Sequence, residues 1–445
     1  MTNAPTPPGD RILLLDVLRG FAVLGILLMN IIGFGLPSPS YSHPGFDVSA
    51  ALSPDLVAWA TVEILGEGCM RGLFSLLFGA SLLLFTTGDG AKGAAIHYRR
   101  MAWLLVFGLV DAYLLLWFGD ILICYAICGA ILYPLRNARA RTLIVLAALV
   151  ALLSTALYSV LHLMLQFARD AHEALAGGAD PATLPPGFES AAAGWREFSA
   201  PYLVGAEAVQ EELSQRRGSY ASAFAWNLPQ VNSILFFVNP VFLLWDALMM
   251  MLLGMALYRL AILRGGGSPG TLRGLMLGGF ALGLGVNGWE VARAITGGLD
   301  LVGTFAQLQW SYHLGRFGMT LGYLGLVAWL LRHGRLAALT RRLAAVGRMA
   351  LSNYLLHSVV ALFLFTGAGL GLVGELGRAQ LYLVVMALWA LQLWLSPWWL
   401  ARHRFGPMEY LWRLLTYLRV PAAQAAVPHW WSAASSLSRA RTSCT

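Results

Sequence analysis

Three polar residues lie within the first apolar segment of the chain, where residues 15–30 read LDVLRGFAVLGILLMN. Asp16 and Arg19 are one helical turn apart, a spacing at which opposite charges pair. Arg19 and Asn30 are eleven residues apart, so a helix places them on one face, about 16 Å apart along its axis. Ionisable residues inside an apolar helix usually face a cavity or a partner. The spacing therefore predicts either a structural Asp16–Arg19 clamp or a polar path that ends at Asn30.

A histidine follows this segment. His43 is the one histidine of the loop 34–55, where Pro39 and Pro44 stiffen the backbone on either side of it. An imidazole with its ordinary pKa near ~6.5 can accept a proton at neutral pH, and an asparagine amide can donate to an oxyanion. His43 and Asn30 are thus a candidate base and a candidate oxyanion donor. The alternatives are an inert surface histidine and an asparagine bonded to a neighbouring helix.

Further polar residues recur along the apolar segments. Glu63, Glu67 and Arg71 follow one helical face at spacings of four residues. Any one such residue is more often an interhelical hydrogen bond than a site, but their number favours a polar interior cavity. The other members of this group are Asp120, Tyr125, Asp246, Asn287, Glu290, His313, Arg316, Asn353 and His357.

Apolar segments of membrane-spanning length carry these residues. The 445 residues are 58% hydrophobic and 12% charged, whereas soluble domains are about 25% charged. Because a crossing needs roughly 20 apolar residues, the sequence predicts an all-α polytopic membrane helix bundle. We expect about ten transmembrane helices and no cleaved signal. The predicted spans are 12–33, 69–87, 101–118, 120–135, 143–166, 236–258, 272–290, 314–331, 349–368 and 379–400.

Basic residues are distributed unevenly over the connecting segments. Alternate segments and the two chain ends carry 21 of the 30 Lys and Arg residues. The positive-inside rule makes that side cytoplasmic, with both termini on it. The net charge of +8 is explained by this pattern and does not require nucleic acid.

The chain is expected to form a single integral membrane domain over residues 1–445. Within it, 167–235 is predicted to be an extracytoplasmic helical insertion and 420–445 a flexible cytoplasmic tail. Residues 55–68 are expected to form an amphipathic helix on the outer surface. The four cysteines form no CxxC pair, so no metal site is predicted.

Several motifs resemble those of the YeiB-like bacterial membrane proteins. They are the opening LDVLRGFAVLGILLMN, then RGLFSLLFGASL, GDILICYA and GRMALSNYLLHS, and the long C-terminal run from RAQLYLVV to YLWRLLTY. The resemblance covers nearly the whole chain. That family is grouped with the transmembrane acyltransferases, which include heparan glucosaminide acetyltransferase and the acyltransferase-3 enzymes.

The resemblance implies an enzyme of the bacterial inner membrane that takes an acyl group from cytoplasmic acyl-CoA. The acceptor would be a hydroxyl or amine of the cell envelope on the far side. No cofactor would be bound permanently. The expected partners are membrane lipid, acyl-CoA and the acceptor, with a homodimer left open.

The same resemblance suggests residue roles. Arg19 matches the arginine of the acyltransferase-3 first span, but Asn30 stands where those enzymes have a catalytic histidine. The heparan enzyme also has asparagine there and a catalytic histidine in the next outer loop, which makes His43 the counterpart, at a different spacing. The catalytic candidates are therefore His43 and Asn30. The residues predicted to bind donor or substrate are Asp16, Arg19, Arg71, Asp120, Tyr125, Arg316, Asn353 and His357.

Two other functions fit the same sequence. A transporter would also have many spans and buried ionisable residues, although no repeated half and no recurring Gly/Pro-broken helices are visible. A membrane binding protein without catalysis is the third alternative.

Overall fold

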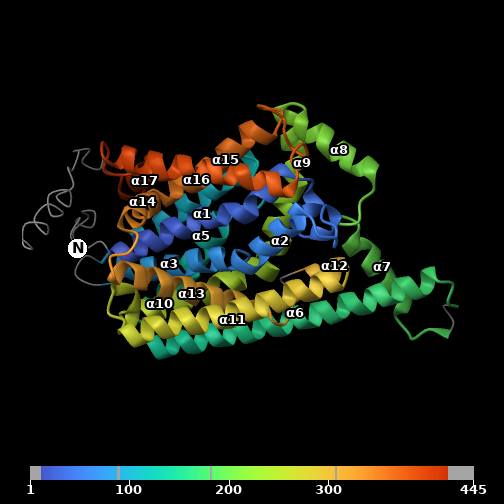
Figure 1. Ribbon diagram of the computed structural model, residues 1–445, viewed down its shortest axis with the longest axis horizontal. Helices are drawn as coiled ribbons and strands as arrows, with labels where there is room; N and C mark the ends of the chain where they lie inside the picture. The colour runs from blue at the N-terminus through green and yellow to red at the C-terminus, as the bar shows by residue number, and fades with distance from the viewer. Residues whose placement is uncertain (1–11, 88–90, 181–182, 306–307, 419–445) are drawn as a thin grey trace, which may run out of the picture.

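The computed structural model describes residues 12–87, 91–180, 183–305 and 308–418, and these contain helices and no strand. The predicted all-α bundle is confirmed (Figure 1). The predicted tail, 420–445, lies outside the described residues. The α-helices are α1 (Leu13–Gly35), α2 (Pro54–Leu65), α3 (Cys69–Thr86), α4 (Ala94–Leu109), α5 (Leu122–Leu132), α6 (Ala140–Ala176), α7 (Phe188–Ser199), α8 (Ala206–Arg217), α9 (Tyr220–Ser233), α10 (Leu244–Arg259), α11 (Pro269–Thr296), α12 (Leu301–Thr304), α13 (Tyr312–Arg332), α14 (Ala337–Arg348), α15 (Ala350–Phe365), α16 (Arg378–Leu400) and α17 (Pro407–Tyr417).

Fewer helices than predicted are long and apolar enough to cross a membrane. The described residues contain seven, which correspond to α1, α2 with α3, α6, α9 with α10, α11, α13 and α16. The pair α14 and α15, bent by 80°, raises the number to eight if it counts as one span. The predicted spans 101–118 and 120–135 correspond to α4 with the π-helix η4 (Val110–Leu114) and to the short α5. Three predicted spans are therefore not among the seven. Charged residues in α4 and the break before α5 account for two of them, and the third, 349–368, is the 16-residue α15.

Helix α1 occupies the middle of the bundle, next to α3, α14, α15 and α16 (Figure 1). Its residues from Leu14 to Gly35 are mostly buried, as expected for a helix that is apolar around most of its surface. Small residues let α14 approach it closely. A Cβ on Gly20 would meet the Leu343 carbonyl group, and one on Gly347 would lie 2.7 Å from the Gly20 nitrogen. The first helix is thus fixed by backbone-to-backbone packing.

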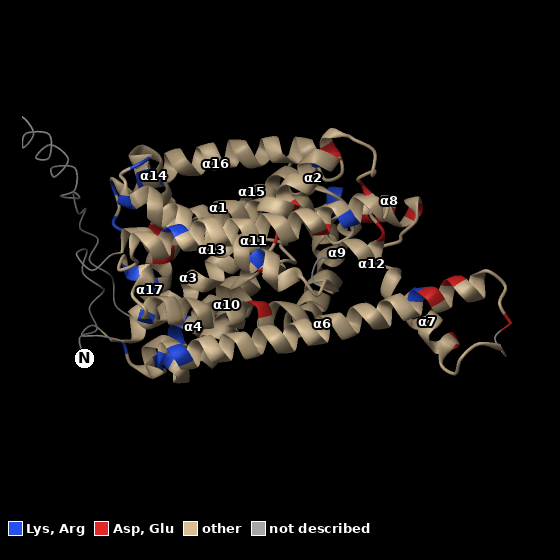
Figure 2. Ribbon diagram, turned by 60° about the horizontal axis from the view of Figure 1, so that its bottom comes forward, with Lys and Arg blue, Asp and Glu red and all other residues tan. Residues whose placement is uncertain are grey.

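The two ends of the bundle differ in charge. Figure 2 shows Lys and Arg gathered where α14, α17 and the start of α4 lie, and we call this the basic end. The start of α1 and helix α17, which bound the described chain, both lie there (Figure 1). The loop after α1 and helices α7 and α8 lie at the opposite end. This arrangement agrees with the uneven distribution of basic residues in the sequence.

Helices also form over 167–235, but the boundaries of the predicted insertion cut through two of them. Helix α6 continues past residue 167 to Ala176, and α9 starts at Tyr220 and leads through the π-helix η7 (Ile234–Leu243) into α10. The separate part is therefore α7 and α8. Likewise, the predicted surface helix 55–68 is α2, which begins at the Ser53 cap and joins α3 in one 33-residue candidate span. Trp59 and Val62 of α2 are buried.

Candidate functional site

A cavity of about 1440 Å³ lies between α1, α2 and the start of α3 on one side and α6, α7, α9 and η7 on the other. Its walls differ in character. Leu157, Leu161, Phe237 and Val241 are among the residues of the apolar wall, contributed by α6 and η7. The opposite wall is polar and carries Asn30, Tyr41, Ser42, Glu63, Glu67, Arg71, Tyr354 and Arg378. The cavity is thus amphiphilic, with room for a head group and an apolar chain.

Asn30 faces this cavity from α1. It is 6% exposed and lines the wall. Among the described residues, its side-chain amide has no hydrogen-bond partner, although buried amides are usually bonded. The sequence placed Asn30 on a helix face with Arg19, and the structure puts that face against open space at the Asn30 end.

The loop after α1 brings His43 beside the cavity. Its neighbours Ser42 and Pro44 line the wall, while His43 is buried and its Nε2 would lie 2.9 Å from a Cβ placed on Gly45. Nδ1 of His43 is buried without a partner among the described residues. Burial lowers the pKa of His43, and the nearby Asp47 and Asp300 oppose that shift. The imidazole is therefore disposed to be neutral at neutral pH.

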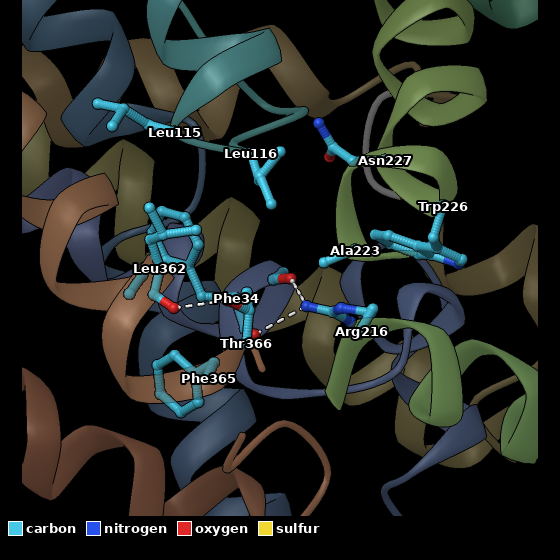
Figure 3. Close-up of a pocket in the computed structure, with 12 residues that line it drawn as sticks. Phe34, Leu115, Leu116, Arg216, Ala223, Trp226, Asn227, Leu362, Phe365 and Thr366 are labelled. Carbon is cyan, nitrogen blue, oxygen red and sulfur yellow. Dashed lines mark hydrogen bonds between the residues drawn. The ribbon is translucent and has the colours of Figure 1, made fainter. Parts of the chain in front are cut away.

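Helix α8 fixes the end of α1 and the start of this loop. Figure 3 shows Arg216 reaching from α8 to the carbonyl groups at the end of α1. Its guanidinium donates to the oxygens of Gly33, Phe34 and Leu36 at 2.8–3.0 Å, which satisfies acceptors that a helix end leaves free. Glu212 pairs with Arg216 at 2.9 Å and accepts hydrogen bonds from Ser38. Beside Arg216 lies a small cavity of about 20 Å³, enough for one water.

Arg378, the first residue of α16, fixes the rest of the loop. It donates to both carboxylate oxygens of Asp47, at 2.9 and 2.8 Å, and to the Ser40 carbonyl at 2.8 Å. Bidentate pairs of this kind add geometric definition as well as energy. The loop with His43 is therefore anchored at two points, and neither Arg378 nor Arg216 was among the predicted site residues. The position of Arg378, a charged residue directly before the predicted span 379–400, is the feature of the sequence that could have identified it.

Arg71 belongs to a buried ion pair on the cavity wall. Its guanidinium donates to Asp246 at 3.0 and 3.2 Å and to the Tyr312 hydroxyl at 2.6 Å. The backbone oxygen of Arg71 accepts from Tyr125, whose hydroxyl also bonds Ser75 at 2.6 Å. Arg71 and Tyr125, predicted separately, thus meet in one network. Asp246 is 3.9 Å from His313.

Arg316 forms a second buried pair. It contacts Glu63 at 3.1 Å and also pairs with Glu290, which accepts from Ser311. Glu63 and Arg71 come from different helices, because the chain breaks between α2 and α3 at Gly68, whose φ is +65°. Glu63, Glu67 and Arg71 nevertheless line one cavity, as the sequence pattern suggested.

Glu67 lies at that break and has a different environment. It is 8% exposed and lines the cavity, and no ion pair or side-chain hydrogen bond forms to it among the described residues. Tyr41, in the loop after α1, is close enough to feel this charge. Burial, with the charge of Glu67 as the next contribution, raises the pKa of Tyr41 to about 12.

Asp120 is positioned behind the cavity wall. It caps the start of α5 by accepting from the Ile123 N–H at 2.9 Å, and it accepts from the Tyr354 hydroxyl at 3.3 Å. Tyr354 and Ile121 line the cavity. Asp111, which is fully buried in η4, lies against Asp120, and π-helical turns of this kind are frequent at functional sites.

The remaining predicted residues lie away from the cavity. At the basic end, Arg19 pairs with Asp16 at 3.1 Å and donates to Ser81 at 2.9 Å, so the predicted pairing is confirmed. Asn353 and His357 belong to a network between α15 and α16. There, Asn353 donates to Ser396 at 3.1 Å and His357 lies 3.0 Å from Gln392. The structure thus brings together Asn30, Arg71, Tyr125 and the His43 loop, with Asp120 and Arg316 just behind.

Comparison with known proteins identifies relatives of similar length. The family model described as "Protein of unknown function (DUF418)" matches residues 257–419. The chain is 30% identical to "Uncharacterized protein YeiB" of Escherichia coli (strain K12) over 421 residues, covering 92% of this chain and 96% of that protein. It is 28% identical to "Uncharacterized protein YxaH" of Bacillus subtilis (strain 168) over 428 residues, 93% and 96% of the two chains. No solved structure matches significantly. The chain belongs to the YeiB-like protein family.

Proposed function

We propose that this protein is an integral membrane acyltransferase that moves an acyl group from cytoplasmic acyl-CoA to an extracytoplasmic hydroxyl or amine. One observation carries the proposal. The amphiphilic cavity is lined by Asn30 and by Ser42 and Pro44, the chain neighbours of His43, so an oxyanion donor faces a space that suits an acyl chain and a buried base lies directly beside that space.

In the proposed reaction, the acceptor oxygen or nitrogen attacks the thioester carbonyl carbon. A C–O or C–N bond forms, and the C–S bond breaks as CoA leaves as the thiolate. His43 takes the proton that the acceptor loses and returns it to the thiolate. The Nδ2–H of Asn30 donates to the carbonyl oxygen while it carries negative charge. Its amide is unsatisfied within the protein, which suits it to an external acceptor.

The donor would approach from the basic end, which we propose is cytoplasmic and contains both chain termini. Arg19 lies there, three helical turns before Asn30 on the same helix, and a guanidinium suits CoA phosphates. Asp16 and Ser81 hold Arg19 in place. In this proposal, Arg71, Asp120, Tyr125 and Arg316 shape the cavity wall, while Asn353 and His357 hold α15 against α16. The acceptor would come from the cell envelope, and the membrane would be the bacterial inner membrane.

The test is thioester turnover by the purified full chain in lipid nanodiscs. The protein is incubated with labelled acetyl-CoA and longer acyl-CoAs, with and without a cell-envelope extract, and free thiol and labelled product are measured. Acyl transfer predicts release of thiol that depends on protein, and label in the extract. Asn30→Ala should lose most of this turnover, whereas the exposed His403→Ala at the basic end should retain it. No thiol release with any acyl-CoA would contradict the proposal.

Transport is the second candidate, because two spans are interrupted. Helices α14 and α15 meet at 80°, and Pro229 and Pro240 lie within α9 and η7. Broken helices are a feature of transporter binding sites. Accumulation of an amphiphilic solute in proteoliposomes, together with inactivity towards acyl-CoA, would favour this function.

A further inference from the structure

The charges around the cavity do not balance. On or just behind the polar wall, three arginines, Arg71, Arg316 and Arg378, accompany five carboxylates. Four carboxylates are paired, namely Asp47, Glu63, Asp246 and Glu290. The fifth, Glu67, lines the cavity. When these eight groups of the polar wall are ionised, they leave two negative charges in excess. Glu197, Glu211 and Glu212 also line the cavity, from α7 and α8, and among the described residues only Glu212 of these is paired with an arginine.

An excess of negative charge is destabilising in the interior of a membrane protein. A carboxylate removed from water is destabilised in its charged form unless a cation or hydrogen-bond donors compensate it. Glu67 is more than nine-tenths buried and forms no ion pair and accepts no side-chain hydrogen bond among the described residues. Arg71 and Arg316 act on it electrostatically, but both are already paired with other carboxylates. Asn30, also unpartnered and more than nine-tenths buried, lines the same cavity. Two unsatisfied buried side chains thus face one space, which points to a ligand that supplies donors and positive charge.

The apolar wall defines the rest of that ligand. Leu157 and Phe237 line the cavity and are 38% and 63% exposed. They belong to the candidate spans Ala140–Ala176 and Tyr220–Arg259, so the apolar wall is continuous with a lipid-facing surface. An amphiphile could therefore place its chain along α6 and η7 with its head group near Glu67.

We propose that the cavity binds an amphiphile with a cationic amine head group, and that the Glu67 carboxylate is its counter-ion. In the proposed reaction this amphiphile would be the acceptor: its ammonium group would first give one proton to the Glu67 carboxylate, and the neutral amine would then attack the thioester. That part of the inference rests on the proposed function. Binding of the amphiphile does not depend on the proposed function, because it needs neither acyl-CoA nor turnover.

Binding is tested with three probes of equal chain length: octylamine, octanol and octanoate. The full chain is reconstituted in nanodiscs of neutral phosphatidylcholine at pH 7, and isothermal titration is corrected with empty discs. Wild-type protein should bind octylamine at least tenfold more tightly than octanol, and octanoate most weakly. Glu67→Gln, which keeps the size and shape of the side chain, should reduce the amine preference to less than twofold and leave octanol binding unchanged. Glu207→Gln, an exposed carboxylate of α8, should retain the preference.

Two results would overturn this inference. One is equal binding of octylamine and octanol by the wild-type protein, which would mean that protons neutralise the excess charge. The other is an amine preference that survives in Glu67→Gln. Failure of acyl transfer alone leaves the binding result intact, and loss of amine binding leaves transfer to a neutral acceptor testable.

Discussion

At the scale of single residues, Asn30 and His43 are the two groups through which chemistry at the cavity can be tested. Asn30 projects from a buried helix, and His43 lies in a loop anchored by Arg216 and Arg378. Burial of α1 and the hydrogen bonds to the loop hold both residues in place, as a site that needs fixed geometry requires.

Replacing His43 by alanine should lower acyl transfer by about 10²–10⁴-fold, the typical contribution of a general base. Donor binding should be unchanged, because His43 lies at the end opposite Arg19. The rates of His43→Ala and of the control His403→Ala are compared under saturating acyl-CoA. Undiminished turnover in His43→Ala would refute the assignment.

The pH profile gives an independent check. A general base must be unprotonated, and burial lowers the pKa of His43 below its ordinary 6.5. The rate should therefore be flat at neutral pH and fall only on the acid side, with a midpoint below 6.5. That acid limb should disappear from the residual activity of His43→Ala. A midpoint above 6.5 would show that another group is titrating.

Arg19 has two partners, and a lysine can replace the guanidinium fork at only one of them. If Arg19 also contacts the donor, Arg19→Lys should raise the KM for acyl-CoA about tenfold with little change in kcat. Ser81→Ala removes one partner of Arg19 without touching the charge and serves as the control. Equal, small effects of the two variants on KM would limit Arg19 to a structural clamp.

At the scale of elements, the crossing of α1 and α14 determines where Arg19 and Asn30 point. Gly347→Ala would place a Cβ against the Asp16 carbonyl group and 2.7 Å from the Gly20 nitrogen, where only backbone could move. We expect it to destabilise the protein by about 1–3 kcal/mol. Gly278→Ala, on an open face of α11, should instead stabilise by about 0.5–1 kcal/mol. The unfolding temperatures of both variants in detergent test whether the backbones of α1 and α14 are in close contact at Gly347.

At the scale of the whole molecule, charge asymmetry predicts the orientation in the membrane. The basic end should face the cytoplasm. In a Cys444→Ser background, a cysteine at Ala51 should react with an impermeant thiol reagent in intact cells, and one at Ala338 should react only after lysis. Both positions are exposed, and the cysteines Cys69, Cys124 and Cys128 are buried. The reverse pattern would invert the proposed direction of transfer.

Local sequence was enough for the features that depend on neighbours along one helix. The apolar periodicity predicted the all-α bundle and a helix for every expected span, because membrane crossing requires long apolar helices. The Asp16–Arg19 pair followed from a spacing of three residues. The number of full-length spans did not follow, because 101–118 and 120–135 fold as shorter, interrupted helices and 349–368 forms the 16-residue α15, bent by 80° from α14.

Only the tertiary structure decided which charged side chains have a partner of opposite charge. Asp246 lies 175 residues from Arg71, and Asp47 lies 331 residues from Arg378, so no local pattern could pair them. Glu63, Glu67 and Arg71 look equivalent in the sequence. Packing gives partners to the first and third and leaves Glu67 facing the cavity. The sequence thus determined which residues are polar within an apolar chain. The arrangement of distant helices determined where charge is left over, because ion pairing depends on distance in space.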